Sequence, residues 1–183
     1  MLKNYKKIFV FFLLSAAFAV SALAQDAPTV VIVVRHGEKQ TSDPANTDPP
    51  LSEAGAKRAQ SLIQMAEEAG VSVIYTTQFK RARETAQPLA DKLKIPVVPM
   101  EVNGANLNSY PSVMAKEILA KHAGKTVLVI GHTNTVPQMV EALGGKMPPA
   151  IDDAAEFDRL YVVIVPKKGA VKVVRGRYGE SKG

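Results

Sequence analysis

The sequence predicts an α/β domain, a three-layer α/β/α sandwich whose sheet is mainly parallel and ends in a C-terminal antiparallel hairpin. Continuous apolar, β-branched runs at 29–34 and 126–130 are typical of strands buried on both faces. Stretches with helical spacing separate such runs, as expected where crossover helices cover both faces of a parallel sheet. Near the end of the chain, 160–165 and 170–174 flank the turn 166–169, which indicates a hairpin.

Strand and helix alternate through the first half of the chain. After the first strand comes a loop at 43–50 that is rich in Pro, Asp, Asn and Thr. Ser52 is a suitable N-cap for the next helix, because its hydroxyl can accept a backbone N–H of the first turn. A second strand is expected at 71–75. A second helix is expected from Phe79, and it contains Pro88, which should bend it.

The second half continues the alternation. A third strand is expected at 95–98, at an edge of the sheet, because the prolines in and after it cannot donate to a neighbouring strand. A helix at 111–122, the buried strand at 126–130 and a helix at 133–143 follow. No internal repeat or linker divides this part of the chain.

Length and composition fit one globular domain. The chain has 183 residues, of which 46% are hydrophobic and 22% charged, and it has three histidines and no cysteine. The lack of cysteine excludes disulfides, thiolate metal sites and a cysteine nucleophile. With so few histidines, a metal site is not expected either.

The N-terminal 24 residues have the pattern of a signal peptide. Lysines precede the apolar run 8–20, and Ala22-Leu23-Ala24 provides the small residues that signal peptidase recognises. An uncleaved anchor is disfavoured, because 13 helical residues span about 20 Å of a ~30 Å bilayer core. We therefore expect a signal peptide at 1–24, a single domain at 25–183, a periplasmic or secreted location, and no stable membrane anchor after cleavage.

Charge gives no support for nucleic-acid binding. Loss of residues 1–24 would reduce the 23 basic residues to 20 against 17 acidic ones, and the formal charge from +6 to +3. The remaining sequence has no run of Lys and Arg beside stacking aromatic residues. Nucleic acid is therefore not an expected partner.

Two of the three histidines directly follow predicted strands. His36 comes after the first strand and His132 after the fourth. Because ligands of open α/β sheets bind beyond the carboxyl ends of the strands, we expect both at one site. His122, next to Lys121 near a helix end, is expected to be structural.

Four segments carry a resemblance to a known family. They are Val33-Val34-Arg35-His36-Gly37-Glu38, Leu51-Ser52-Glu53-Ala54-Gly55, the stretch 74–86 with its Arg81-Ala82-Arg83-Glu84-Thr85-Ala86, and Val129-Ile130-Gly131-His132. Together, and in this order, they resemble the motifs of the histidine phosphatase superfamily, also called phosphoglycerate-mutase-like. The resemblance extends from residue 30 to about residue 140.

The resemblance implies a catalytic role for both histidines. His36 would be the nucleophile, whose neutral imidazole attacks phosphorus and forms a phosphohistidine. His132 would bind the transferred group and stabilise its transition state. Arg35, Arg81, His132 and Thr133 would bind the phosphate, for which arginine is suited by its planar, permanently charged fork of donors. No metal or other cofactor is implied.

The proton donor is left open by the residues. The mutase-like branch of the family has a glutamate after the third strand, where Glu101 is the nearest match, although its surroundings differ from that motif. The segment Gly131-His132-Thr133-Asn134 lacks the His-Asp pair by which the acid-phosphatase branch supplies its proton donor. Other acids, each of which fits an ordinary surface carboxylate, are Glu38, Asp152, Asp153 and Glu156.

The sequence thus predicts an exported phosphatase that hydrolyses phosphate monoesters through a phosphohistidine on His36. The alternative is a phospholigand-binding module of the same fold with weak or no turnover. The expected partner is a small phosphorylated substrate or a phosphorylated surface glycan. Neither the particular substrate nor the oligomeric state follows from the sequence.

Overall fold

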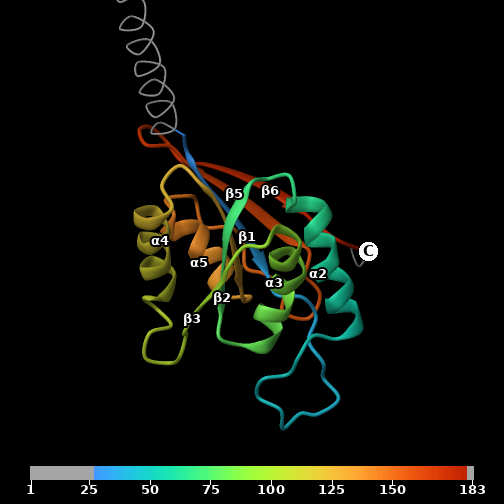
Figure 1. Ribbon diagram of the computed structural model, residues 1–183. Helices are drawn as coiled ribbons and strands as arrows, with labels where there is room; N and C mark the ends of the chain where they lie inside the picture. Colours follow the sequence, from blue (N-terminus) through green and yellow to red (C-terminus); the bar gives the residue numbers. More distant parts are fainter. Residues whose placement is uncertain (1–26, 181–183) are drawn as a thin grey trace, which may run out of the picture.

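A six-stranded sheet in the order β3-β2-β4-β1-β5-β6 runs through the middle of the computed structural model, which describes residues 27–180 (Figure 1). The predicted signal peptide, 1–24, lies outside the described residues. The strands are β1 Thr29–Arg35, β2 Val71–Thr77, β3 Val97–Met100, β4 Thr126–Gly131, β5 Arg159–Val165 and β6 Lys172–Arg177.

The sheet is parallel except at one side. β1, β2, β3 and β4 run parallel, whereas β5 pairs antiparallel with both β1 and β6. The predicted mainly parallel sheet and C-terminal hairpin are therefore confirmed. β3 lies at an edge, as its prolines indicated.

Helices cover both faces of the sheet and complete the three layers (Figure 1). On one face, α2 and α3 bury Leu62 and Leu89 against the β1 side chain of Ile32. On the other, α4 and α5 bury Met114 and Val140 together with neighbouring strand residues. The helices are α2 Glu53–Ala66, α3 Lys80–Leu93, α4 Tyr110–Lys121 and α5 Thr135–Ala142. Within 27–180, no helix is long and apolar enough to cross a bilayer.

Local side-chain contacts decide where the helices next to the site begin. The Ser52 side chain accepts from the Gly55 N–H, which confirms the predicted N-cap of α2. α5 begins at Thr135 and not at Thr133 as predicted. The reason is a turn in which the Thr135 hydroxyl accepts the backbone N–H of His132 at 2.8 Å.

Candidate active site

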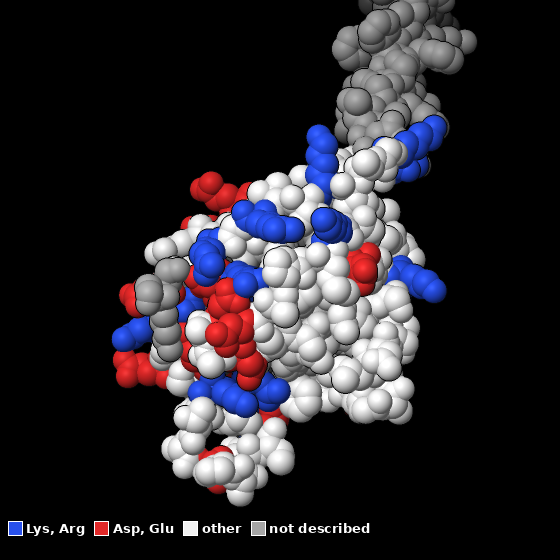
Figure 2. Space-filling view, turned by 180° about the vertical axis from the view of Figure 1, so that it is seen from behind, with Lys and Arg blue, Asp and Glu red and all other residues white. Residues whose placement is uncertain are grey.

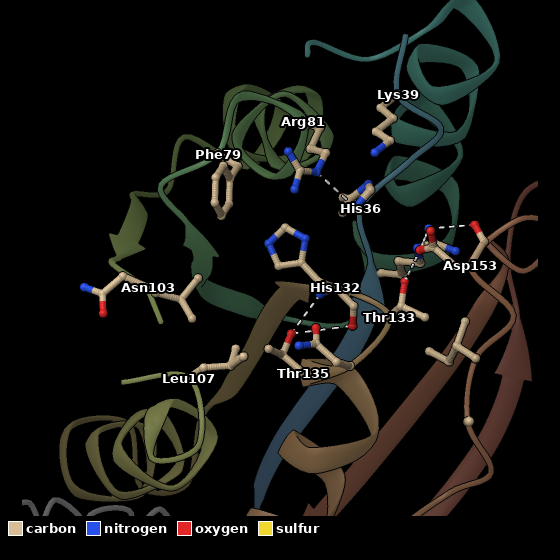
Figure 3. A pocket seen from close by; sticks show the side chains of 15 residues that line it. His36, Lys39, Phe79, Arg81, Asn103, Leu107, His132, Thr133, Thr135 and Asp153 are labelled. Carbon is tan, nitrogen blue, oxygen red and sulfur yellow. Dashed lines mark hydrogen bonds and ion pairs between the residues drawn. The ribbon is translucent and has the colours of Figure 1, made fainter. Parts of the chain in front are cut away.

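A cavity of about 620 Å³ opens beyond the carboxyl ends of β1 and β4, and its lining includes Arg35, His36, Arg81, His132 and Thr133 (Figure 3). The register of the parallel β1–β4 pair sets Arg35 beside Gly131, so the residues that follow them emerge next to each other. The structure therefore brings together every predicted site residue except Glu101.

His36 is buried and held in one orientation. Its Nδ1 lies 2.7 Å from the carbonyl oxygen of Gly37, and its Nε2 lies 3.2 Å from the Nε of Arg81, which donates to it. These partners assign the proton to Nδ1 and the lone pair to Nε2. Burial, followed by the nearby cationic groups, lowers the pKa of His36 to about 3. The ring is therefore neutral at pH 7, and its Nε2 is free of a proton.

Two glycines of the motifs explain how the chain turns after β1. A Cβ on Gly37 would lie 2.8 Å from the carbonyl oxygen of Gly55. A Cβ on Gly55 would in turn collide with the backbone of Glu38. The Gly37 N–H donates to the Thr85 hydroxyl at 2.9 Å, so α3 also fixes this turn. The first turn of α2 and the residues after β1 thus pack backbone against backbone.

His132 faces the cavity from the other side of His36. The centroids of the two rings are 5.0 Å apart. The Thr77 hydroxyl, at the end of β2, lies 2.8 Å from its Nε2, and the Phe79 ring packs edge-to-face against it at 5.4 Å. Burial first, and then Arg81 and Arg35, lower the pKa of His132 to about 4. The site therefore holds two neutral imidazoles at pH 7.

Arg81 lies over the cavity from the first turn of α3. Its guanidinium packs over the Phe79 ring, 4.5 Å from the ring centroid, while its Nε reaches His36. The nearest carboxylate, Asp48, is 3.7 Å from its Nη1. Asp48 also accepts the backbone N–H of Lys80 at 2.9 Å, so the loop before α2 helps to cap α3. Arg81 thus presents a cationic donor beside the nucleophile position.

Arg35 lines the same cavity, but its terminal nitrogens bind the loop between α5 and β5. Nη1 donates to the carbonyl oxygens of Asp152 and Glu156, and Nη2 donates to the carbonyl and the carboxylate of Asp153. The guanidinium also stacks on the Phe157 ring at 3.8 Å. Only its Nε is buried without a partner among the described residues. In this state Arg35 therefore holds a loop, and the phosphate role implied by the resemblance would use donors that are already occupied.

Asp153 is a carboxylate that no sequence pattern distinguishes from an ordinary surface acid. It is the only acidic side chain among the described residues that line the cavity. Thr133 donates to its Oδ1 and, with Arg35, lowers the pKa of the Asp153 carboxyl. Thr133 thus lies in the predicted place, with its hydroxyl bonded to this carboxylate.

Glu101 is exposed and does not line the cavity. The next residue, Val102, is buried, because Gln78 binds both of its backbone polar groups: the amide of Gln78 donates to the Val102 carbonyl at 2.7 Å and accepts its N–H at 3.0 Å. With Val102 facing inward, Glu101 points to solvent. Gln78 is thus the residue that sets this arrangement.

Glu38 is not the surface carboxylate that the sequence suggested. It is 7% exposed and forms a buried ion pair with Arg58 of α2 at 2.8 Å. Arg58 also donates to the backbone carbonyl oxygen of Tyr178. The hydroxyl of Tyr178 in turn donates to the backbone carbonyl oxygen of Arg35. The segment around Tyr178 thus supports the end of β1, and no local sequence pattern predicts this role.

The described residues show no grouping of three or more His, Cys, Asp or Glu side chains that could hold a metal ion. Arginine and neutral imidazole are the groups at hand, and they suit an anion with several oxygens.

Fold and site define the class of protein: a three-layer α/β domain with two facing histidines and arginines at the carboxyl edge of a parallel sheet. Residues 31–102 match the histidine phosphatase superfamily (branch 1). This is the family whose motifs the sequence resembles, and the match covers the first three of the four motif segments.

The similarity of this chain to individual relatives covers different shares of its length. The chain is 32% identical over 77 residues to the uncharacterized phosphatase PhoE of Bacillus subtilis (strain 168), and the match spans 40% of each protein. Among solved structures, the protein histidine phosphatase SixA complexed with tungstate has a TM-score of 0.61 at 18% identity, covering 81% of this chain and 96% of that one. Bacillus stearothermophilus YhfR has a TM-score of 0.59 at 19% identity, covering 80% and 95%. These two structures show the likeness of fold.

Proposed function

We propose that the chain is an exported phosphatase that hydrolyses phosphate monoesters through a phosphohistidine on His36. The observation that carries the proposal is the state of His36: a buried, neutral ring whose unprotonated Nε2 lies 3.2 Å from the Nε of Arg81. Such a nitrogen is a nucleophile at neutral pH, and the arginine beside it can bind the group under attack. The match of residues 31–102 to the histidine phosphatase superfamily and the similarity to a Bacillus subtilis phosphatase support the same activity.

The chemistry would proceed in two displacements. Nε2 of His36 attacks phosphorus, the N–P bond forms, and the ester P–O bond breaks with its electron pair on the leaving oxygen. Positive charge then develops on the ring, and the Gly37 carbonyl, which accepts from Nδ1, stabilises it. Arg81, His132 and Thr133 surround the phosphoryl oxygens. Water next attacks phosphorus, the N–P bond breaks, and Nε2 regains its lone pair.

Export rests on the signal-peptide pattern of residues 1–24 and is part of the proposal. The experiment is N-terminal sequencing of the protein recovered outside the cytoplasm, with Gln25 expected as the first residue. Retention of Met1 in a membrane fraction would contradict it.

A phospholigand-binding module is the second candidate, and one observation favours it. The terminal nitrogens of Arg35 are occupied by the loop 152–156. Such a protein would bind phosphate between Arg81 and His132 but would form no covalent intermediate.

Trapping of the intermediate separates the two candidates. Purified protein is mixed briefly with ³²P-labelled phenyl phosphate and quenched in alkali, in which phosphohistidine survives. We expect label on His36, its loss in His36→Asn, and its persistence in His122→Asn, the matched histidine at the C-terminal end of α4. Turnover should also persist in EDTA. Phosphate binding without label or release would leave only the binding module.

A further inference from the structure

One wall of the cavity is apolar, and it lies across the cavity from Asp153. Phe79, Val102 and Leu107 form this wall, and all three pack against the same hydrophobic core cluster. Figure 3 shows Phe79, Asn103 and Leu107 on one side of His132, and Lys39 and Asp153 on the opposite side beyond His36. The phosphate-binding candidates Arg81 and His132 therefore adjoin the apolar wall, whereas Asp153 lies at the opposite end of the cavity.

The wall is held rigidly in place. Gln78 binds the backbone N–H and carbonyl of Val102, and Phe79 is fixed between Arg81 and His132. A preorganised apolar surface of this kind favours a flat, apolar body, since an aromatic ring gains by burial there.

The wall offers little to a polyhydroxylated body. Its polar residue, Asn103, uses its side-chain oxygen to accept the backbone N–H groups of Ala105 and Asn106. Hydroxyls of a sugar placed against Phe79 and Leu107 would lose water without finding partners, which costs free energy for each unpaired group. A carbohydrate leaving group thus fits this end of the cavity poorly.

The supply of a proton to the leaving group also argues against a sugar. Asp153, the one acid among the described lining residues, lies across the cavity from the wall and is held as a carboxylate by Thr133 and Arg35. An alkoxide leaving group needs a proton, because alcohols ionise about as weakly as water, with a pKa of about 16. A phenol ionises at a pKa of about 10 and can leave as the anion.

We propose, on the basis of the phosphatase activity argued above, that the wall formed by Phe79, Val102 and Leu107 selects aryl phosphate monoesters. The ring rests on the wall, Nε2 of His36 attacks phosphorus, and the P–O bond breaks with its electron pair on the phenolate oxygen. Bulk water protonates the phenolate after release. A water molecule then cleaves the N–P bond and gives inorganic phosphate and a proton. Surface glycan phosphates are accordingly disfavoured as substrates.

Three substrates separate the ring from the leaving group. Phenyl phosphate has both features, benzyl phosphate keeps the ring but leaves as an alkoxide, and glucose 6-phosphate has neither. We expect kcat/KM to fall in that order, with about 100-fold between the first and the last, the scale on which an apolar pocket discriminates. A phosphotyrosine peptide shows whether a protein or a small molecule supplies the aryl group: turnover at the rate of phenyl phosphate assigns the ring to a protein, and its rejection assigns it to a small phenol.

A substitution and its control test the wall itself. Leu107→Asn should reduce the preference for phenyl phosphate over glucose 6-phosphate about tenfold. Asn106→Asp, at the preceding residue and outside the cavity lining, is the control and should leave that preference unchanged.

The failures of the two proposals are distinguishable. If glucose 6-phosphate is hydrolysed as well as phenyl phosphate, the aryl preference is wrong and the phosphatase stands. If no substrate releases phosphate and no label reaches His36, the phosphatase itself is wrong. Should Leu107→Asn fail to fold, the substrate order of the unmodified protein still decides.

Discussion

Arg81 and Arg35 line one cavity but do different things in it. The Nη atoms of Arg35 bind the loop before β5, whereas Arg81 keeps its guanidinium beside His36 with Asp48 no nearer than 3.7 Å. We therefore expect Arg81→Lys to lower kcat/KM about 10²–10³-fold, roughly 2.7–4 kcal/mol of transition-state stabilisation, because a lysine keeps the charge but loses the planar pair of donors. Steady-state kinetics with phenyl phosphate measure it.

The control for this substitution is Arg83→Lys, two residues further along α3. Arg83 is exposed and faces away from the cavity lining. Its variant should keep full turnover, and both variants should melt within a few degrees of the unmodified protein. Equal losses of activity in the two variants would show that Arg81 has no special place beside His36.

At this scale the sequence predicted residues whose surroundings are local. His36 and His132 were found because each directly follows a buried strand. Asp153 could not be found in the same way, since its ion pair joins it to a residue 118 positions earlier in the chain. Glu101 was favoured by its position after the third strand, but the hydrogen bonds of Gln78 turn the neighbouring Val102 inward instead.

The contact between α2 and the end of β1 depends on Gly55. A methyl group at this position would overlap the backbone of Glu38, which cannot move away without shifting His36 and Gly37. We expect Gly55→Ala to lower the free energy of unfolding by about 1–3 kcal/mol, the usual cost of overpacking, and to reduce turnover as well. Urea unfolding measures the first effect and phosphate release the second.

Gly104→Ala is the matched control for that substitution. Nothing lies within 4 Å of a Cβ placed on Gly104, and its backbone is not in the left-handed region. Its free energy of unfolding should stay unchanged or rise slightly. If the two alanine variants were equally stable, the close approach of α2 to residue 38 would not be the reason for glycine in this motif.

Most elements could be predicted because each carries its own pattern. β1 and β4 begin where the apolar runs predicted, and each ends one residue later than predicted, at Arg35 and at Gly131. β6 extends to Arg177, three residues beyond the predicted end at 174, because its pairing with β5 continues through exposed polar residues. Backbone pairing to a partner strand, rather than apolar periodicity, sets that boundary.

The site forms only in the complete sheet, because it depends on the order of the strands. β1 lies between β4 and β5, so His36 has His132 on one side and the loop that leads into β5 on the other. The sequence predicted the shared edge of the sheet, but the adjacency of β1 and β4 is a property of the assembled sheet. The long-range contacts of Arg35 and Arg58 add support from segments more than 100 residues away.

Charge is mixed over the face seen in Figure 2, where acidic side chains lie between basic ones. The strands of the hairpin show the same pairing, with Arg159 2.6 Å from Glu156 and Arg177 2.7 Å from Asp158. That face thus has no continuous basic surface of the kind that binds a phosphate backbone. The expectation that nucleic acid is not a partner stays a prediction.

Acid should destabilise the folded protein through its two site histidines. Burial lowers the pKa of His36 to about 3 and that of His132 to about 4, while a histidine in the unfolded chain has a pKa of about 6.5. Between these values the unfolded chain binds more protons than the folded one. The stability due to the neutral rings is therefore complete above pH 6.5 and is lost as the pH falls toward 4, by up to about 1.4 kcal/mol per pH unit for each ring.

Melting curves from pH 7 to 4 test this, and the double variant His36→Asn, His132→Asn should show a flatter dependence on pH. An equally steep fall in that variant would assign the acid sensitivity to other groups.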